Sequence, residues 1–116
     1  SRADLASPDA GRRVYFGAMR LATAARARQP FVLSALRLGT IRILHLPGEP
    51  MLEFQRFAQR CRPDDFVVVA GYGDCAPAYL CTDRAFTEGG YEPDASNLAP
   101  GAEPLVKGAI ERLLGP

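Results

Sequence analysis

The amino-acid sequence predicts an α/β fold: a mixed sheet, made of a hairpin and a parallel β-α-β crossover, flanked by helices. Two apolar runs with β-type composition, residues 41–46 and 66–70, enclose a helical stripe at residues 50–60. The order strand, helix, strand predicts a right-handed crossover whose two strands are parallel. Further helical patterns lie before and after this unit, so we expect helices to flank the sheet.

Length and composition limit the possible classes of protein. The 116 residues fit a single domain or a fragment of a larger one, with residues 1–7 and 115–116 expected as flexible ends. The formal net charge of +1 gives no electrostatic reason to expect nucleic acid or an anionic membrane as partner. No apolar run approaches the roughly 18 residues that a membrane span needs. Arginine supplies 13 of the 14 cationic side chains, which points to a GC-rich bacterial source.

The first predicted element is a helix that begins at Ser7-Pro8-Asp9 and runs to about Arg28. Ser can cap a helix, Pro fits the first turn, and Asp suits the positive end of the dipole. Pro30 ends the helix, because the residue before a proline is pushed out of the α region. The arginines of this helix are interpreted as a solvent-exposed face, and an anion-binding patch is the alternative interpretation.

Two strands come next, residues 31–37 and 41–46, and Gly39-Thr40 fits a tight hairpin between them because glycine supplies the positive φ. In the second strand Ile41, Ile43 and His45 share one face, and Arg42, Leu44 and Leu46 share the other. Both faces are largely apolar, so we expect this strand to be covered on both sides.

The second half of the chain continues with a helix over residues 50–60, in which Pro50 takes the first helical position. The β-branched run at residues 66–70 is typical of a central parallel strand. Residues 71–100 show no clear period and are predicted to form a long loop, and such loops are often functional. A last helix is expected over residues 103–114.

The two parallel strands should end at the same edge of the sheet, where open α/β sheets bind ligands. Pro47-Gly48-Glu49 follows the first strand and Gly71-Tyr72-Gly73-Asp74 follows the second. We therefore expect Glu49 and the segment around Tyr79 to meet at one site. Glu49 is interpreted either as a helix cap or as a metal ligand or general base.

Other chemically capable residues also have two interpretations each. Tyr79 and Tyr91 are either packing residues or donors to a metal or to a developing oxyanion. His45, the only histidine, is favoured as an interior or edge residue. Asp74 is a turn residue or a ligand, and Gly73-Asp74 favours the turn.

The three cysteines, Cys61, Cys75 and Cys81, are expected as reduced thiols, although Cys75 and Cys81 could pair. One histidine and one such glutamate cannot complete a catalytic zinc site, which commonly has three protein ligands.

Three motifs resemble the late part of the catalytic domain of the neutral (non-lysosomal) ceramidase family. Residues 46–49 read Leu-Pro-Gly-Glu, residues 71–82 read Gly-x-x-Asp-x-x-x-x-Tyr-x-x-Thr, and residues 90–92 read Gly-Tyr-Glu. The family has Asn where this chain has Asp74. The similarity covers roughly residues 31–115 and lies in the order and spacing of the motifs.

The resemblance implies a zinc amidase that hydrolyses the N-acyl bond of ceramide. It makes Glu49 and Tyr79 zinc ligands and places Tyr91 beside the reacting carbonyl, where it would bind the oxyanion. The family's two zinc histidines and its catalytic histidine and arginine are absent here. The chain therefore resembles a carboxyl-side fragment of a larger protein, and the fragment is expected to be inactive by itself. The resemblance implies that this parent protein is secreted or periplasmic and acts on an amide or lipid-like substrate.

A second hypothesis from a different class is a non-catalytic α/β module that mediates self-association. A truncated domain would leave an apolar sheet face or edge uncovered, and such surfaces favour homo-oligomers. A dimer or higher oligomer is therefore expected.

Overall fold

The computed structural model describes residues 8–74 and 77–115, so the expected flexible ends at 1–7 and 116 lie outside the described residues. The chain divides into two units, residues 1–30 and 31–116. The first contains helix α1 (Pro8–Ala25), with Asp9 in its first turn. The helix ends earlier than the predicted Arg28, and residues 26–28 form a turn. No helix among the described residues has the length and apolar character to cross a membrane.

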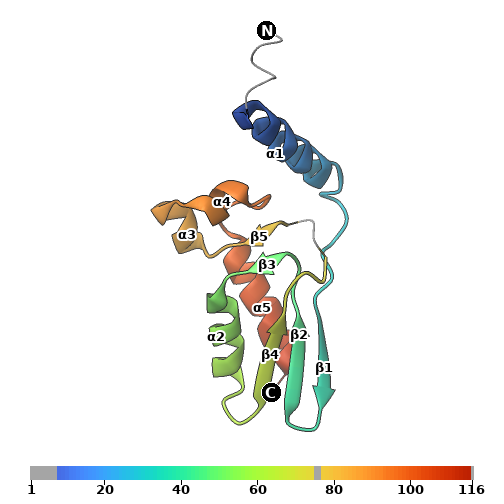
Figure 1. Ribbon diagram of the computed structural model, residues 1–116. Coiled ribbons are helices and arrows are strands. Elements are labelled where there is room, and N and C mark those ends of the chain that lie inside the picture. The colour runs from blue at the N-terminus through green and yellow to red at the C-terminus, as the bar shows by residue number, and fades with distance from the viewer. Residues whose placement is uncertain (1–7, 75–76, 116) are drawn as a thin grey trace. The chain divides into compact units, whose positions relative to one another are not determined.

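The second unit has the predicted α/β architecture, with a three-stranded mixed sheet (Figure 1). Strand β1 (Ser34–Leu38) pairs antiparallel with β2 (Ile41–His45), and β2 pairs parallel with β4 (Phe66–Ala70). Gly39 has a φ of +63° in the hairpin turn, as the prediction required. The bounds of β4 match the predicted run. Its position in the sheet does not, because β4 is an edge strand and β2 is the central one.

The residues after β2 and β4 form a second, smaller sheet that the sequence did not predict. Strand β3 (Glu49–Pro50) pairs parallel with β5 (Tyr79–Leu80). Pro50 therefore belongs to a strand, and helix α2 (Leu52–Cys61) begins later than predicted, with Met51 as its N-cap. The predicted loop over residues 71–100 contains β5 and two short helices, α3 (Asp83–Glu88) and α4 (Tyr91–Ala95).

The core lies on one face of the three-stranded sheet. Helix α2 packs on β4, and α5 (Ala102–Leu114) packs on α2 and lies behind the sheet in Figure 1. Leu44 and Leu46 are fully buried there against Phe54 and Ile110. Burying a large apolar side chain stabilises a fold by about 1.5–3 kcal/mol, so these contacts hold the helices to the sheet.

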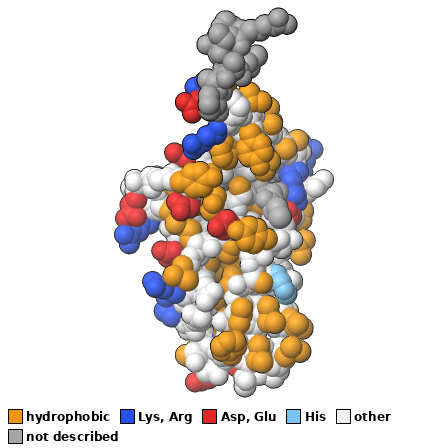
Figure 2. Space-filling view, in the orientation of Figure 1, with side chains coloured by type: hydrophobic (Ala, Val, Ile, Leu, Met, Phe, Trp, Pro, Cys, Tyr) orange, Lys and Arg blue, Asp and Glu red, His pale blue; other side chains and the backbone are white. Residues whose placement is uncertain are grey.

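The described part of residues 31–115 leaves the opposite face of the sheet exposed. Ile41, Leu38 and Phe66 are exposed on it, and Figure 2 shows apolar side chains gathered over β4, β2 and β1. Within residues 31–115 the described elements therefore cover β2 on one face only, whereas the sequence predicted that both faces are covered. An alternation of polar and apolar residues would have marked the open face, but the chain carries apolar residues on both faces of β2.

Candidate functional site

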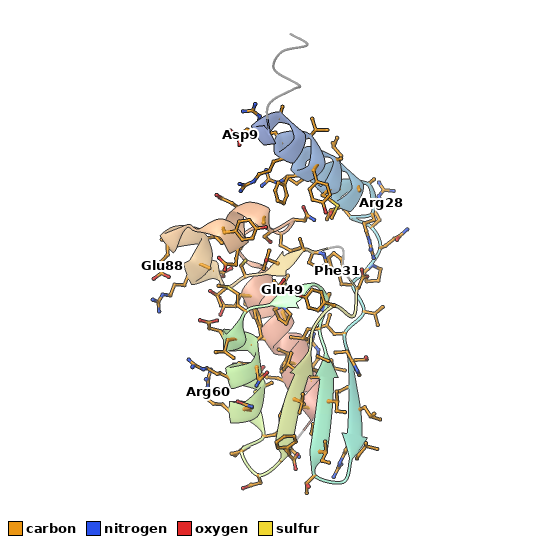
Figure 3. All side chains as sticks on the ribbon, in the orientation of Figure 1. Asp9, Arg28, Phe31, Glu49, Arg60 and Glu88 are labelled. Atoms are coloured by element: carbon orange, nitrogen blue, oxygen red, sulfur yellow. The ribbon has the colours of Figure 1, made fainter. Side chains whose placement is uncertain are left out.

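Backbone hydrogen bonds hold Glu49 directly beside Tyr79. In the parallel pairing of β3 with β5, Glu49 is the register partner of Tyr79. The Glu49 N–H donates to the Ala78 carbonyl at 2.7 Å, and the Met51 N–H donates to the Leu80 carbonyl at 3.0 Å. Figure 3 labels Glu49 at this junction, where the chain has left β2 and runs beside β5. The segments around Glu49 and Tyr79 therefore meet, as the sequence predicted.

Two glycines permit this close approach of backbone segments. Gly48 has a φ of +63°, and a Cβ placed there would lie 2.4 Å from the Ala78 carbonyl oxygen. A Cβ on Gly71 would lie 2.8 Å from Cδ of Pro50. Tyr72 and Ala78 also have positive φ without being glycine, and such strained backbone concentrates at functional sites.

The side chains of the two paired residues interact, and a third ring joins them. The Glu49 carboxylate lies near enough to the Tyr79 phenol to influence its ionisation. The Tyr91 ring, at the start of α4, meets the Tyr79 ring edge-on, with centroids 5.7 Å apart and planes at 78°. The three residues to which the resemblance assigns a role, Glu49, Tyr79 and Tyr91, therefore lie together.

The surroundings of Tyr79 favour its neutral phenol. Partial burial raises the pKa of Tyr79 above its ordinary value, and the charge of Glu49 and the neighbouring Tyr91 raise it further. Glu92 acts in the same direction from α4. Negative charges that surround a phenol disfavour phenolate, and a bound cation would reverse that effect.

A pocket of about 270 Å³ opens at this junction. Three carboxylates and one phenol line it, from Glu49, Glu53, Glu92 and Tyr79, together with apolar side chains at residues 50–52. Within residues 31–74 and 77–115, no salt bridge neutralises Glu49 or Glu92. The pocket is therefore electronegative and suits a cation better than an anion.

The pairing of β3 with β5 corrects one interpretation of Glu49. The helix-cap alternative is wrong, because Glu49 lies within β3 and the N-cap of α2 is Met51, which makes no side-chain capping hydrogen bond. Helix α2 begins two residues later than the Pro-Gly-Glu-Pro sequence suggested. The metal-ligand and general-base interpretations of Glu49 stay as predictions.

The remaining candidates lie outside the pocket. His45 is on the open face of the sheet, with Nδ1 3.4 Å from the Ser34 hydroxyl. The Asp74 carbonyl accepts a hydrogen bond from the Gly48 N–H at 2.7 Å, so the backbone of Asp74 helps to shape the junction. Cys61 and Cys81 are free thiols, whereas Cys75 lies outside the described residues.

One residue that the sequence did not single out helps to position Tyr79. The buried Ser96 hydroxyl donates to the Tyr79 carbonyl at 2.8 Å and accepts from the Leu98 N–H at 3.1 Å. The Asn97 N–H also donates to the Pro77 carbonyl at 2.9 Å. Nothing in the local sequence marks Ser96, because its partner lies 17 residues earlier in the chain.

The donor set fits half of a metal site. A carboxylate and a phenol from register-paired strands can both face one ion, and oxygen donors of this kind bind zinc. Among the described residues, however, no group of three or more His, Cys, Asp or Glu side chains could hold a metal ion. Glu49 and Tyr79 could therefore contribute to such a centre only with ligands from elsewhere.

Replacing Glu49 by Gln is expected to lower the pKa of Tyr79, because the carboxylate charge that opposes phenolate is removed. Absorbance titration of tyrosine measures this, with Tyr79→Phe identifying the component that belongs to Tyr79. Glu53→Gln is the matched control, since Glu53 lines the same pocket but lies outside the groups that raise the Tyr79 pKa. Equal titrations in the Glu49→Gln variant and in the unmodified chain would contradict the arrangement.

Comparisons of this chain with protein-family models, with curated proteins and with solved structures gave no match. The likeness to neutral ceramidases stays a prediction made from three sequence motifs. A function must therefore be inferred from the residues at the junction of β3 and β5 and from their geometry.

Proposed function

We propose that this chain is the carboxyl-side part of a ceramidase-like zinc amidohydrolase, which hydrolyses the N-acyl bond of an amide or lipid-like substrate. One observation carries the proposal: Glu49 and Tyr79 are register partners and line the same pocket. The motif resemblance assigns these same two residues to zinc, although they are 30 positions apart in the sequence. Their adjacency supports the assignment independently of that resemblance.

Glu49 and Tyr79 would hold the metal from one side, and two histidines outside this chain would complete the centre. Zinc supplies an activated water and polarises the carbonyl of the amide. The chain contributes a carboxylate and a phenol presented by adjacent strands, in an electronegative pocket that favours a divalent cation. Backbone hydrogen bonds to Ala78 and Leu80 hold that geometry before any metal arrives.

Tyr91 would act on the substrate rather than on the metal. Its ring contacts the Tyr79 ring edge-on, so its hydroxyl belongs to the same small region. The Tyr91 side chain is about half exposed, at 53%, and so is accessible to a substrate. A phenol in this place can donate a hydrogen bond to the oxygen that becomes negative when water attacks the amide, which lowers the barrier.

Isothermal calorimetry with zinc tests the proposal on the whole chain. Weak binding is expected, because two ligands are present where a catalytic site commonly has three. Binding should fall at least about tenfold, or about 1.4 kcal/mol, in the Glu49→Ala, Tyr79→Phe double variant. Glu111→Gln is the control and should keep the affinity, because Glu111 is exposed on α5 and lies outside the pocket.

Three results would contradict the proposal. Equal zinc binding by the unmodified chain and the double variant would place the metal elsewhere. Amidase turnover by this chain alone, abolished by Glu49→Ala, would show that the site is complete and that no external histidines are needed. Absence of zinc binding in the unmodified chain would remove the support for a preformed half-site.

The open face of the sheet favours a second candidate, a non-catalytic module that self-associates. Leu36, Leu38, Ile41 and Phe66 are all more than 40% exposed on this face. Exposed apolar surface of this kind is typical of interaction sites. Light scattering at high concentration tests the candidate: a dimer or larger species is expected, and a monomer would count against it.

A further inference from the structure

Hydrogen bonds from two separate segments hold strand β5, which has only two residues of its own. Strand β3 supplies the first set, to the carbonyls of Ala78 and Leu80. The residues that follow α4 supply the second set, to the carbonyls of Pro77 and Tyr79. A two-stranded sheet is marginally stable by itself, so the position of Tyr79 depends on this second segment as well as on β3.

The Ser96 hydroxyl makes the hydrogen bond to residue 79. Ser96 follows the last residue of α4 as its C-cap and is only 4% exposed. Its hydroxyl accepts from the Leu98 N–H at 3.1 Å and donates to the Tyr79 carbonyl at 2.8 Å. A serine hydroxyl has one hydrogen, and the bond to Leu98 leaves that hydrogen for Tyr79. A buried carbonyl that loses its donor is costly, so removing this hydroxyl should displace the backbone of Tyr79.

Helix α4 meets residue 79 at both of its ends. At its start, Tyr91 contacts the Tyr79 ring edge-on, with centroids 5.7 Å apart. At its end, Ser96 binds the backbone of the same residue. Figure 1 shows α4 beside β5, and the two elements are in contact. A helix of five residues is too short to be stable by itself, so these two contacts fix where the Tyr91 ring stands relative to Tyr79.

We propose that Ser96 is a positioning residue for the half-site formed by Glu49 and Tyr79. It acts through the backbone of Tyr79, and it holds the phenol of Tyr79 in place relative to Glu49 and to the ring of Tyr91. Groups that hydrogen-bond to a metal ligand commonly orient it without touching the metal. The effect on zinc rests on the proposed function, whereas the contact between the two tyrosine rings needs no metal.

Isothermal calorimetry of the full chain with zinc gives the first test. Ser96→Ala should bind zinc about tenfold more weakly than the unmodified chain, the lower end of the usual loss when a metal ligand is deprived of its hydrogen-bonding partner. Ser96→Thr keeps a hydroxyl and should restore most of the affinity. Thr82→Ala is the matched control, because the Thr82 hydroxyl is also buried near Tyr79 but accepts from the Ala85 N–H. It should destabilise α3 and leave the zinc affinity unchanged.

The nuclear Overhauser effect between the ring protons of Tyr79 and Tyr91 gives a second test that is independent of zinc. It should be present in the unmodified chain and in Thr82→Ala, and it should be lost in Ser96→Ala. Tyr91→Phe assigns the signals. Ser96→Cys serves here if Ser96→Ala fails to fold, because the thiol is of similar size and is a weaker donor, so the effect should weaken. Circular dichroism shows which variants are folded.

Equal zinc affinities of Ser96→Ala and the unmodified chain would overturn the role of Ser96 in the half-site and leave the proposed function standing. Loss of affinity of the same size in Thr82→Ala would assign the effect to lower stability and would also overturn that role. A ring contact that persists in the folded Ser96 variants would overturn the attachment of α4 to Tyr79. Absence of zinc binding in the unmodified chain would overturn the proposed function instead, and the ring contact would then decide alone whether Ser96 positions Tyr79.

Discussion

Replacing Gly48 by Ala is expected to lower the free energy of unfolding by about 2–4 kcal/mol, one of the largest single-residue effects in this chain. Two causes add. The φ of +63° is unfavourable for any residue with a Cβ, and the new Cβ would lie 2.4 Å from the Ala78 carbonyl oxygen. No side-chain rotation can relieve this clash, because the position of the Cβ is fixed by the backbone at residue 48 and the oxygen belongs to the backbone of Ala78. The strands β3 and β5 must therefore separate. Urea unfolding measures the change.

Gly39→Ala is the matched control for this prediction. Gly39 has the same φ of +63° in the hairpin turn, but nothing lies within 4 Å of a Cβ placed there. The decrease in the free energy of unfolding of Gly39→Ala should therefore reflect backbone strain alone, about 1–2 kcal/mol. Equal destabilisation by the two substitutions would mean that the close approach of Gly48 to Ala78 contributes nothing.

The Gly48 variant also connects the fold to the site. Separation of β3 from β5 moves Glu49 away from Tyr79, so the pKa of Tyr79 should fall in Gly48→Ala as it does in Glu49→Gln. Gly39→Ala should leave the Tyr79 titration unchanged, since the hairpin turn lies at the other end of β2. This difference would show that Gly48 acts on the site and not only on stability.

Arg42→Ala is expected to destabilise the chain by about 1.5–3 kcal/mol, the range for hydrogen bonds that involve a charged group. Arg42 is 6% exposed. Its Nε donates to the Asp65 carboxylate at 2.7 Å, and its Nη1 donates to the Leu114 carbonyl at 2.9 Å. One side chain thus joins β2 to the turn before β4 and to the end of α5. Thermal or urea unfolding measures the loss.

Arg37→Ala serves as the control for Arg42→Ala. Arg37 is the register partner of Arg42 on β1, but it is exposed and bonds to the nearby Gly39 carbonyl at 3.3 Å. Its removal should change stability by about 0.5 kcal/mol or less. Arg42→Lys should fall between the two, because lysine keeps the charge but lacks the planar fork. Destabilisation of similar size in Arg37→Ala and Arg42→Ala would contradict the role of the buried pair.

The pH dependence of stability gives a further readout for Arg42. The hydrogen bond from Arg42 lowers the pKa of Asp65 despite the opposing effect of partial burial, and Arg62 assists. A carboxylate with a depressed pKa stabilises the fold above its unfolded-state pKa, and this contribution is lost as the pH falls through the folded-state pKa. Arg42→Ala should therefore make unfolding less sensitive to acid than in the unmodified chain.

Local sequence patterns were sufficient for the main elements. The β-branched run that became β4 (Phe66–Ala70) was placed with its observed bounds, and the Gly39 turn and the parallel pairing of β2 with β4 follow from the chain order. The adjacency of Glu49 and Tyr79 was also predictable, because parallel strands end at the same edge of a sheet. These features depend on hydrophobic period, on turn chemistry and on the order of elements, all of which can be read along the chain.

Other features were decided only by tertiary structure. The pairing of β3 with β5 joins strands of two residues each, too short to show a period, and it moved Glu49 from a helix start into a strand. The edge position of β4 and the open face of β2 depend on which surfaces the helices cover, and apolar residues on both faces concealed that choice. The support of Tyr79 by Ser96 spans 17 residues. Local patterns record what a segment prefers, whereas pairing, coverage and long-range hydrogen bonds depend on partners that are distant in the sequence.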